Sequence, residues 1–299
     1  MKMNQLNQNC YYFSSSVNVG YVHEGNQGLL IDAGIDESAI RKVVRQLDEQ
    51  KLPITHLLIT HAHADHYGGA AYLKKKYNIK VMAPILEAAI VENPIIEPIY
   101  MFQGNTPLKE LRNKFLEGPP VEVDEVVSEG DYQIDGFDLQ LIATPGHSYH
   151  QLAVATYGIL FAADSYFGKK ELNKHKIPYI TCANDTITSL EKLYQTDFDG
   201  ALPGHGPFER NYHETVKANI DYHRELLTVL KEMVDLATHG ISHEDVVSSM
   251  CARFDVKADQ LSMFLMFRTA VTAYIKALIE NNEIKCEVEN YRMIVKSLT

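Results

Sequence analysis

The amino-acid sequence predicts an α/β fold in which two β-sheets pack face to face with helices on the outside, followed by a mostly helical C-terminal region. Short apolar strands alternate with helical stretches up to about residue 206. The strands form two groups, which favours two separate sheets. A Pro-Gly-His-Gly-Pro segment at residues 203–207 precedes a mostly helical pattern. We therefore expect one domain over residues 1–207 and a helical domain over residues 208–299.

The first strand group begins near the N-terminus. Residues 17–23 and 28–32 predict two paired strands, with residues 24–27 as the turn between them. Residues 37–50 predict a helix, because their apolar side chains recur at intervals of three and four. The apolar run at residues 54–60 then predicts a buried strand.

A helix over residues 65–77 and a strand over residues 80–83 come next, and an irregular excursion over residues 93–120 follows them. Five prolines interrupt the excursion, with apolar residues between them. Two interpretations stay open: a surface excursion covered by its own side chains, or a lid or substrate wall. Exposed apolar residues at 95–102 would suit the contact of a homodimer, unless this segment folds back on its own domain.

The second strand group has glycine-containing turns between several of its members. We place its strands at residues 121–127, 132–134, 137–142, 152–156 and 159–163. A short strand at residues 200–202 precedes the change in composition.

The C-terminal region has the element order of a winged-helix module. A helix is expected from residue 212, and a second helix starts near residue 242. Residues 258–281 predict a long helix that is apolar almost all round, which favours burial on several faces. Residues 284–288 and 291–295 predict a closing hairpin.

The composition excludes some classes of partner. The chain has 299 residues, of which 45% are apolar, so it can bury a substantial core without disulfide bonds. Its net charge of −11 argues against broad binding to a phosphate backbone. From residue 209 onward, 11 Lys or Arg face 14 Asp or Glu, so a nucleic acid is not the expected partner.

The N-terminal residues and the cysteines indicate a cytoplasmic protein. The first nine residues are polar and no apolar leader follows them. No uninterrupted apolar run approaches the roughly 20 residues that a membrane span needs, so no membrane partner is expected. The four cysteines are scattered and form no C-x-x-C pair, which is typical of free thiols in a reducing compartment.

Four candidate metal ligands fall within six residues, directly after the apolar strand at 54–60. They are His61, His63, Asp65 and His66. Imidazole nitrogens and carboxylates are ligands for zinc, iron or manganese. The first two histidines alternate on an extended backbone, so both side chains can point to one side.

Three distant residues have a matching position. His147, Asp164 and His205 each follow the end of a predicted strand, and glycine or proline flanks two of them. Side chains at strand ends are well placed for a site, because the sheet fixes the loops that carry them. A site with two metal ions needs about this many ligands in total.

With these residues in this order, the chain resembles the metallo-β-lactamase superfamily over about residues 10–207. The resemblance implies a four-layer αββα sandwich, with a catalytic site at one edge. It also implies two divalent metal ions with seven ligands: His61, His63 and His147 on the first ion, Asp65, His66 and His205 on the second, and Asp164 on both. Zinc is the expected metal, with iron and manganese as alternatives. The C-terminal region resembles the helical, winged-helix-like tail of a broad hydrolase branch.

A water shared by two dications ionises near neutral pH, which predicts a hydrolase that uses a metal-bridged hydroxide. Asp65 is the candidate catalytic residue, because it can accept a hydrogen bond from the nucleophile and shuttle its proton. We expect a small-molecule substrate: an ester, thioester or lactone. A phosphodiesterase or RNase, and a mononuclear iron enzyme that oxygenates a persulfide, are the alternatives. Ala143 stands where proteins of the glyoxalase II kind usually have the first residue of His-Thr-Pro-Gly-His, so the chain departs from that branch.

Overall fold

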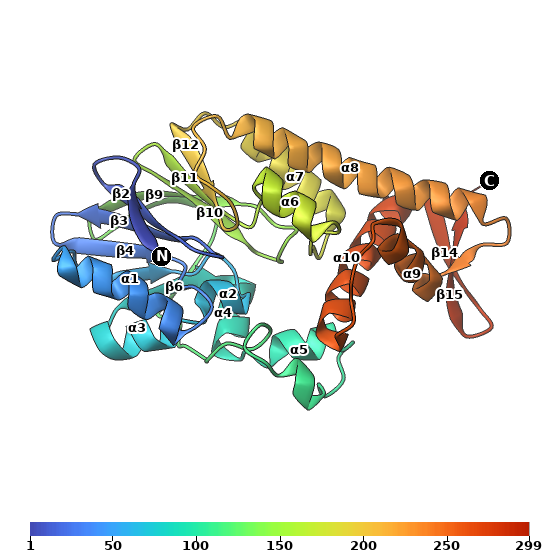
Figure 1. Ribbon diagram of the computed structural model, residues 1–299, viewed down its shortest axis with the longest axis horizontal. Coiled ribbons are helices and arrows are strands. Elements are labelled where there is room, and N and C mark those ends of the chain that lie inside the picture. The colour runs from blue at the N-terminus through green and yellow to red at the C-terminus, as the bar shows by residue number, and fades with distance from the viewer. Residues whose placement is uncertain (299) are drawn as a thin grey trace.

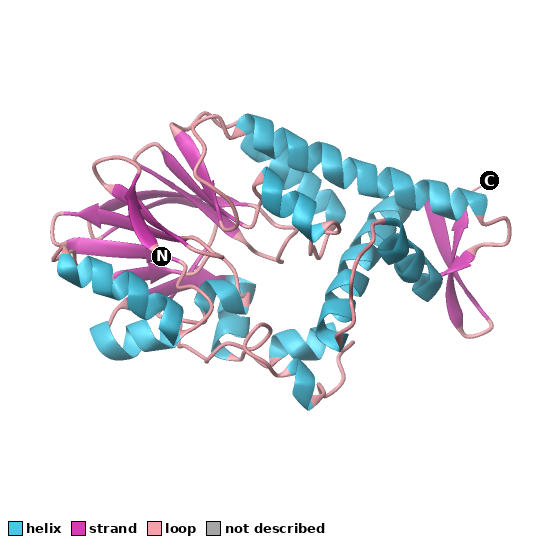
Figure 2. Cartoon of the chain, viewed as in Figure 1, coloured by secondary structure: helices cyan, strands magenta, loops and turns pink. Residues whose placement is uncertain are grey.

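The computed structural model describes residues 1–298, and its first part has four layers in the order helix, sheet, sheet, helix (Figures 1 and 2). One sheet has seven strands in the order β1-β2-β3-β4-β5-β6-β7, and the second has five in the order β12-β11-β10-β9-β8. A third sheet of three strands, β13-β15-β14, lies in the C-terminal part. The αββα arrangement and the C-terminal helices agree with the sequence-based expectation.

The strands span Lys2–Gln5 (β1), Cys10–Ser14 (β2), Val19–Glu24 (β3), Gln27–Ile31 (β4), His56–Leu58 (β5), Lys80–Pro84 (β6), Glu125–Val127 (β7), Gly130–Ile134 (β8), Phe137–Ala143 (β9), Leu152–Thr156 (β10), Ile159–Ala163 (β11), Gly200–Pro203 (β12), Ile241–Ser242 (β13), Ile284–Glu289 (β14) and Arg292–Ser297 (β15). The helices span Glu37–Glu49 (α1), Ala64–Tyr67 (α2), Ala70–Tyr77 (α3), Ile85–Glu92 (α4), Ile96–Met101 (α5), Lys169–His175 (α6), Ala183–Tyr194 (α7), His213–Leu236 (α8), His243–Arg253 (α9) and Leu261–Glu280 (α10), and Lys109–Leu111 form a 3-10 turn (η1).

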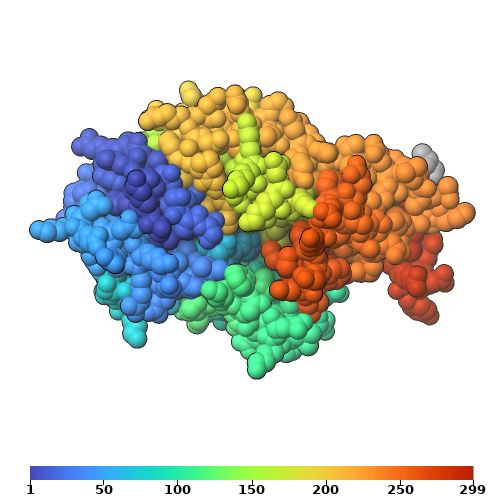
Figure 3. All heavy atoms as spheres, in the orientation of Figure 1, coloured from blue at the N-terminus to red at the C-terminus, as the bar shows by residue number. Residues whose placement is uncertain are grey.

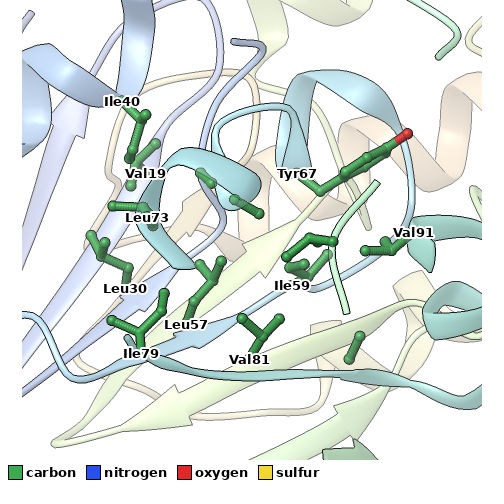
Figure 4. Packing of buried hydrophobic residues seen from close by; sticks show 14 of the residues in the cluster. Val19, Leu30, Ile40, Leu57, Ile59, Tyr67, Leu73, Ile79, Val81 and Val91 are labelled. Atoms are coloured by element: carbon green, nitrogen blue, oxygen red, sulfur yellow. The ribbon is translucent and has the colours of Figure 1, made fainter. Parts of the chain in front are cut away.

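The first sheet is buried on both faces, and the alternation of its side chains divides them between two cores. Leu30, Leu57 and Val81 are direct neighbours across β4, β5 and β6 and pack into the cluster under α1 and α3 (Figure 4). The residues that follow in sequence, Leu58 and Met82, point the other way into the core between the sheets. Period-two alternation produces this division. Each such side chain, fully buried, contributes about 1.5–3 kcal/mol.

The second sheet repeats the pattern. Val154 and Phe161 join the core between the sheets, whereas Ala153 and Leu160 pack outward against α7 and α8. The observed strands β10 and β11 have the predicted bounds. Parallel pairing of β11 with β12 brings the ends of these two strands to the same edge of the sandwich.

One strand prediction was wrong, and two strands were missed. Of residues 121–127, only Glu125–Val127 form a strand, and it pairs in parallel with β6 at the edge of the first sheet instead of joining the second. Sequence alternation records which faces are apolar but does not state which sheet a strand joins. Two further strands were not predicted: β1, in the polar N-terminal segment, and β2 form an antiparallel hairpin at the other edge of that sheet.

The helix expected over residues 65–77 is two helices, α2 and α3, separated at Gly68 and Gly69. A Cβ atom on Gly68 would lie 2.0 Å from the carbonyl oxygen of Ile35. Only glycine therefore allows this close approach, which anchors the short helix bearing Asp65 and His66 against the loop after β4.

The 93–120 excursion is partly helical and folds back on the chain. None of the residues from Ile95 to Phe102 is exposed. Met101 packs with Leu111, Leu116 and Leu265, the last of which lies on α10. Figure 3 shows the green segment of the excursion next to the orange-red start of α10 on the face in view. The exposed apolar surface that suggested a homodimer contact is therefore absent at this segment.

The C-terminal module has the predicted order of helices and hairpin. Its core joins α8, α9 and α10 to β14 and β15, and it also includes Ile177 and Ile180 from the loop before α7. The long helix α8 packs on the second sheet through Val216 and in the C-terminal core through Leu230 (Figure 1). The boundary after residue 207 precedes a helix that both cores share, and it remains a prediction.

Within residues 1–298, α10 is long and apolar enough to cross a membrane by length and composition alone. Its residues Val271, Tyr274 and Leu278 are nevertheless buried in the C-terminal core. Packing of this kind is typical of the central helix of a globular module.

Candidate metal centre

Four loops that follow strand ends carry the seven candidate ligands to one edge of the sandwich. The loop after β5 and the first turn of α2 supply four of them, and the loops after β9, β11 and β12 supply one each. Their donor atoms fall into three overlapping groups in which all atoms lie within 4.8 Å of one another. The groups are His61 with His63 and His147, His61 with His66 and Asp164, and Asp65 with His66 and His205. All seven residues predicted from the sequence are thus brought together.

Each of three histidines has one ring nitrogen held by a protein acceptor while the other faces the cluster. The Nδ1 of His147 lies 2.9 Å from the carbonyl oxygen of Tyr179. The Nδ1 of His205 lies 2.8 Å from the carbonyl oxygen of Ser16. The Nδ1 of His66 lies 2.8 Å from a carboxylate oxygen of Asp32. Such contacts fix the orientation of the ring and leave Nε2 for a ligand.

The residue Asp32 connects the first sheet to the cluster. It is buried and has a φ of 64°, in the left-handed region that few non-glycine residues adopt. Besides His66, its carboxylate accepts hydrogen bonds from the backbone N–H and the hydroxyl of Thr60. Asp32 therefore orients a candidate ligand without itself belonging to the three donor groups.

At Gly204, the neighbouring ligands leave no room for a side chain. A Cβ atom on Gly204 would lie 2.1 Å from Oδ1 of Asp164 and 2.8 Å from Cε1 of His66. The glycine before His205 therefore makes the room in which these two ligands approach each other.

The carboxyl group of Glu87, on α4, joins two ligand loops. It accepts hydrogen bonds from the backbone N–H of Ala62 at 2.9 Å, the hydroxyl of Ser148 at 2.6 Å and the backbone N–H of His150 at 2.8 Å. Ala62 lies between two candidate ligands, and Ser148 follows a third. Sequence analysis missed Glu87, because no local pattern distinguishes it from other helix carboxylates, and only its complete burial marks it.

Burial controls the protonation of three of the imidazoles. It lowers the pKa of His61 well below the ordinary value, that of His63 to about 4, and that of His147 to about 3. These rings are consequently neutral at pH 7, which is the form that binds a metal ion.

The remaining ligands form an ion-paired network. Burial would lower the pKa of His205, but Asp164 and Asp65 raise it to about 10, and acidic neighbours likewise raise the pKa of His66. Burial would raise the pKa of both carboxyl groups, but the histidine charges lower it, so Asp65 and Asp164 are ionised. Anionic oxygens and imidazoles then share one small volume.

The donor set fits divalent cations. Among the described residues, His61 Nε2, His66 Nε2 and Asp164 Oδ1 are buried and make no hydrogen bond, although the last two lie 3.3 Å apart as an ion pair. Buried polar atoms without partners are rare in native proteins and mark an ion, a water or a functional group. Three such atoms in one cluster of imidazoles and carboxylates are the pattern expected of a metal site.

The sequence model of the metallo-beta-lactamase superfamily matches residues 14–227 of this chain. The chain belongs to this superfamily. A hydroxyacylglutathione hydrolase from Rhodopseudomonas palustris (strain BisB5) is 29% identical over 154 residues, which cover 50% of this chain and 48% of the relative. A beta-lactamase-like protein 2 homolog from Caenorhabditis elegans is 26% identical over 232 residues, 74% of this chain and 67% of the relative. The chain thus spans about half the length of the first of these relatives.

Solved structures of the superfamily share the fold over nearly the whole chain. A beta-lactamase domain protein from Burkholderia ambifaria has a TM-score of 0.74 at 18% identity and covers 99% of this chain and 94% of its own. A metallo-beta-lactamase family protein from Thermus thermophilus has a TM-score of 0.73 at 16% identity and covers 98% of this chain and 100% of its own. The fold they share therefore includes the C-terminal module.

Proposed function

We propose that this superfamily member is a metal-dependent hydrolase that holds two divalent cations, zinc by preference, and cleaves a small ester, thioester or lactone in the cytoplasm. One observation carries the two-ion proposal. The Oδ2 atom of Asp164 lies 3.4 Å from Nε2 of His147 and 3.3 Å from Nε2 of His205. It therefore contacts one imidazole from each of the two expected ligand sets, so this carboxylate would be able to serve both cations.

The assignment of ligands follows the three donor groups. His61, His63 and His147 would hold one cation, Asp65, His66 and His205 the other, and Asp164 both. When bound, the cations polarise the scissile carbonyl and lower the pKa of a water molecule towards neutrality. Asp32 and Glu87 act through the ligands: the first orients His66, and the second keeps the two ligand loops in register.

The chain itself supplies the proton transfer. Asp65 is ionised, and its Oδ2 lies 3.4 Å from Nε2 of His205 at the accessible side of the cluster. An anionic carboxylate there can accept the proton of an attacking water and deliver it to the leaving thiolate or alkoxide. No serine or cysteine nucleophile is required.

A thioester is the substrate class with the most support. Several relatives are named hydroxyacylglutathione hydrolase, which is a thioesterase activity. Ala143 lies at the end of β9, where such proteins usually have a histidine, so the thiol portion can differ from theirs. The four free cysteines support a reducing compartment as the place of action.

Metal analysis with a substrate panel tests the proposal. Protein purified without chelator is analysed for zinc, iron and manganese, and then assayed on thioesters, esters, lactones and a phosphodiester. We expect two equivalents of divalent metal and hydrolysis of a thioester or ester. A single equivalent of iron with oxygen uptake on a persulfide would contradict the proposal, as would phosphodiester cleavage with salt-dependent RNA binding.

A further inference from the structure

A buried carboxyl group without a partner lies outside the ligand cluster. Glu97, on α5, is only 4% exposed, and among the described residues its Oε2 atom has no hydrogen-bond partner. Leaving such an atom unsatisfied costs about 1–3 kcal/mol. A glutamate that served only packing would be replaced by methionine or leucine at a gain in stability, so the position calls for a polar function.

The surroundings of Glu97 place it beside the metal centre. Its helix α5 contacts Tyr179, because the sulfur of Met101 lies 3.6 Å from the hydroxyl of that tyrosine. The carboxyl group of Glu97 also interacts electrostatically with Asp65, a candidate ligand. Glu97 consequently lies on the side of the cluster that faces the excursion and α10.

Aromatic side chains line this side of the centre. The ring of Tyr179 lies 5.3 Å from that of His63 and 5.8 Å from that of His147, and both pairs are edge-to-face. The ring of Tyr100 lies 6.1 Å from that of Tyr149, which is 47% exposed. Large rings of this kind offer apolar surface and specific geometry to a bound molecule.

The charge state of Glu97 narrows the class of group that it can bind. Burial, and then the negative charges of Asp65 and Glu87, raise its pKa well above the ordinary value. The neutral carboxylic acid that this favours has one O–H donor as well as acceptor capacity. Because Oε2 of Glu97 has no hydrogen-bond partner among the described residues, a hydroxyl or amide can satisfy it in either protonation state: each can donate to the ionised carboxylate and can also accept from the neutral acid.

We propose that Glu97 is a specificity-determining residue of the proposed hydrolase, where its buried carboxyl group hydrogen-bonds a hydroxyl or amide of the substrate beside the apolar surface of Tyr100, Tyr149 and Tyr179. This assignment depends on the proposed function, because it concerns the substrate of the same site. It makes the 93–120 excursion a substrate wall, which is one of the two roles that the sequence left open.

Matched substrates test the assignment. Thioesters are prepared in pairs that differ by one hydroxyl or one amide, placed on either side of the scissile bond. For the metal-loaded wild type, kcat/KM should favour the polar member of at least one pair by about tenfold or more, since one hydrogen bond is at stake. The variant E97M should lose that preference through a higher KM, and E97Q should retain most of it because an amide also donates and accepts.

The Tm of E97M supplies a second readout. A purely structural role of Glu97 would lower this Tm, whereas the proposed role would not. Removal of an unsatisfied carboxyl group should leave the Tm of E97M unchanged or higher, while its substrate preference disappears. E92Q, an exposed change on the neighbouring helix α4, is the control and should alter neither.

Three results would overturn the assignment. The first is a lower Tm of E97M with an equal loss of kcat/KM on both members of every pair. The others are an E97Q variant that behaves like E97M and a wild type with no preference in any pair. If the metal-loaded wild type hydrolyses none of these compounds, the proposed function itself fails. If the protein is active but its substrate preference does not depend on Glu97, only the assignment of Glu97 fails.

Discussion

At the scale of single residues, the geometry of the candidate centre depends on the acceptors that contact the Nδ1 atoms of three histidine ligands. Carbonyl oxygens of Tyr179 and Ser16 hold two of the histidines, and the carboxylate of Asp32 holds a third. These acceptors come from segments distant in sequence, so the folded chain prepares the donor geometry before a cation arrives. Contacts of this kind typically change metal affinity about 10–100-fold when they are removed.

The first prediction concerns Asp65. D65N removes the anionic oxygen that accepts the proton of the attacking water, so kcat should fall about 100- to 10,000-fold. Steady-state kinetics at saturating metal, with metal content measured on the same sample, separate loss of chemistry from loss of a ligand. D131N, on the exposed side of β8, is the control. Unchanged activity of D65N at full metal loading would exclude this role for Asp65.

A second prediction concerns Glu87. E87Q keeps the size of the side chain but turns an N–H₂ group towards donors from Ala62, Ser148 or His150. The free energy of unfolding should decrease by roughly 2–3 kcal/mol, and metal affinity should fall about 10–100-fold. Urea unfolding and competition with a chromophoric chelator measure the two effects. Metal affinity equal to that of the wild type would show that Glu87 does not align the ligand loops.

At the scale of elements, the excursion and the C-terminal module depend on each other. The start of α10 meets α5 and η1 through a small cluster around Met101 and Leu265. The hydroxyl of Thr269, on α10, also lies 3.7 Å from the sulfur of Met101. The C-terminal module therefore supports the segment that carries Glu97 and Tyr100 towards the metal centre.

The third prediction tests this support. L265A removes a buried side chain from the small cluster, so the free energy of unfolding should fall by about 2–3 kcal/mol. Because the wall bearing Tyr100 loosens while the ligands keep their own contacts, KM should rise more than kcat falls. M263A, a partly exposed position on the same helix, should change both quantities little. A lower kcat of L265A with an unchanged KM would contradict a substrate-wall role.

At the scale of the whole molecule, α8 joins the two cores. His223 lies on this helix, is 2% exposed, and places Nδ1 2.7 Å from the hydroxyl of Tyr274 on α10. Burial, and then the charge of His147, lower the pKa of His223 to about 4. A histidine in the shared helix thus couples stability to pH.

The fourth prediction follows from the sign of that shift. The unfolded chain binds a proton at His223 near pH 6.5, whereas the folded chain does so only near pH 4. The folded state therefore loses stability as the pH falls from about 6.5 to about 4, by up to about 3 kcal/mol from this group. Urea unfolding of metal-free protein at pH 7 and pH 4.5 should show a smaller loss for H223Q than for the wild type. An equal loss of stability in H223Q and the wild type would show that His223 does not contribute to the pH dependence.

Much of the fold could be predicted from the sequence, because local periodicity reports burial directly. The short apolar runs Leu152–Thr156 and Ile159–Ala163 gave strands with the observed bounds, and the helical spacing from residue 37 gave α1 to within one residue. The assignment of residues 121–127 to the second sheet failed, since the choice of sheet is a long-range pairing that local periodicity does not encode. The strands β1 and β2 were not predicted either. The first is a short polar edge strand whose pairing needs no apolar pattern, and it pairs with β2.

The sequence by itself determined the seven candidate ligands, because metal binding requires particular side chains and the spacing from His61 to His66 is local. Only the tertiary structure decided that Glu87 holds two ligand loops together, that Asp32 orients His66, and that Glu97 lies beside the centre. These carboxyl groups are ordinary in the sequence. They acquire their roles from burial and from partners many residues away, which exist only after the chain has folded.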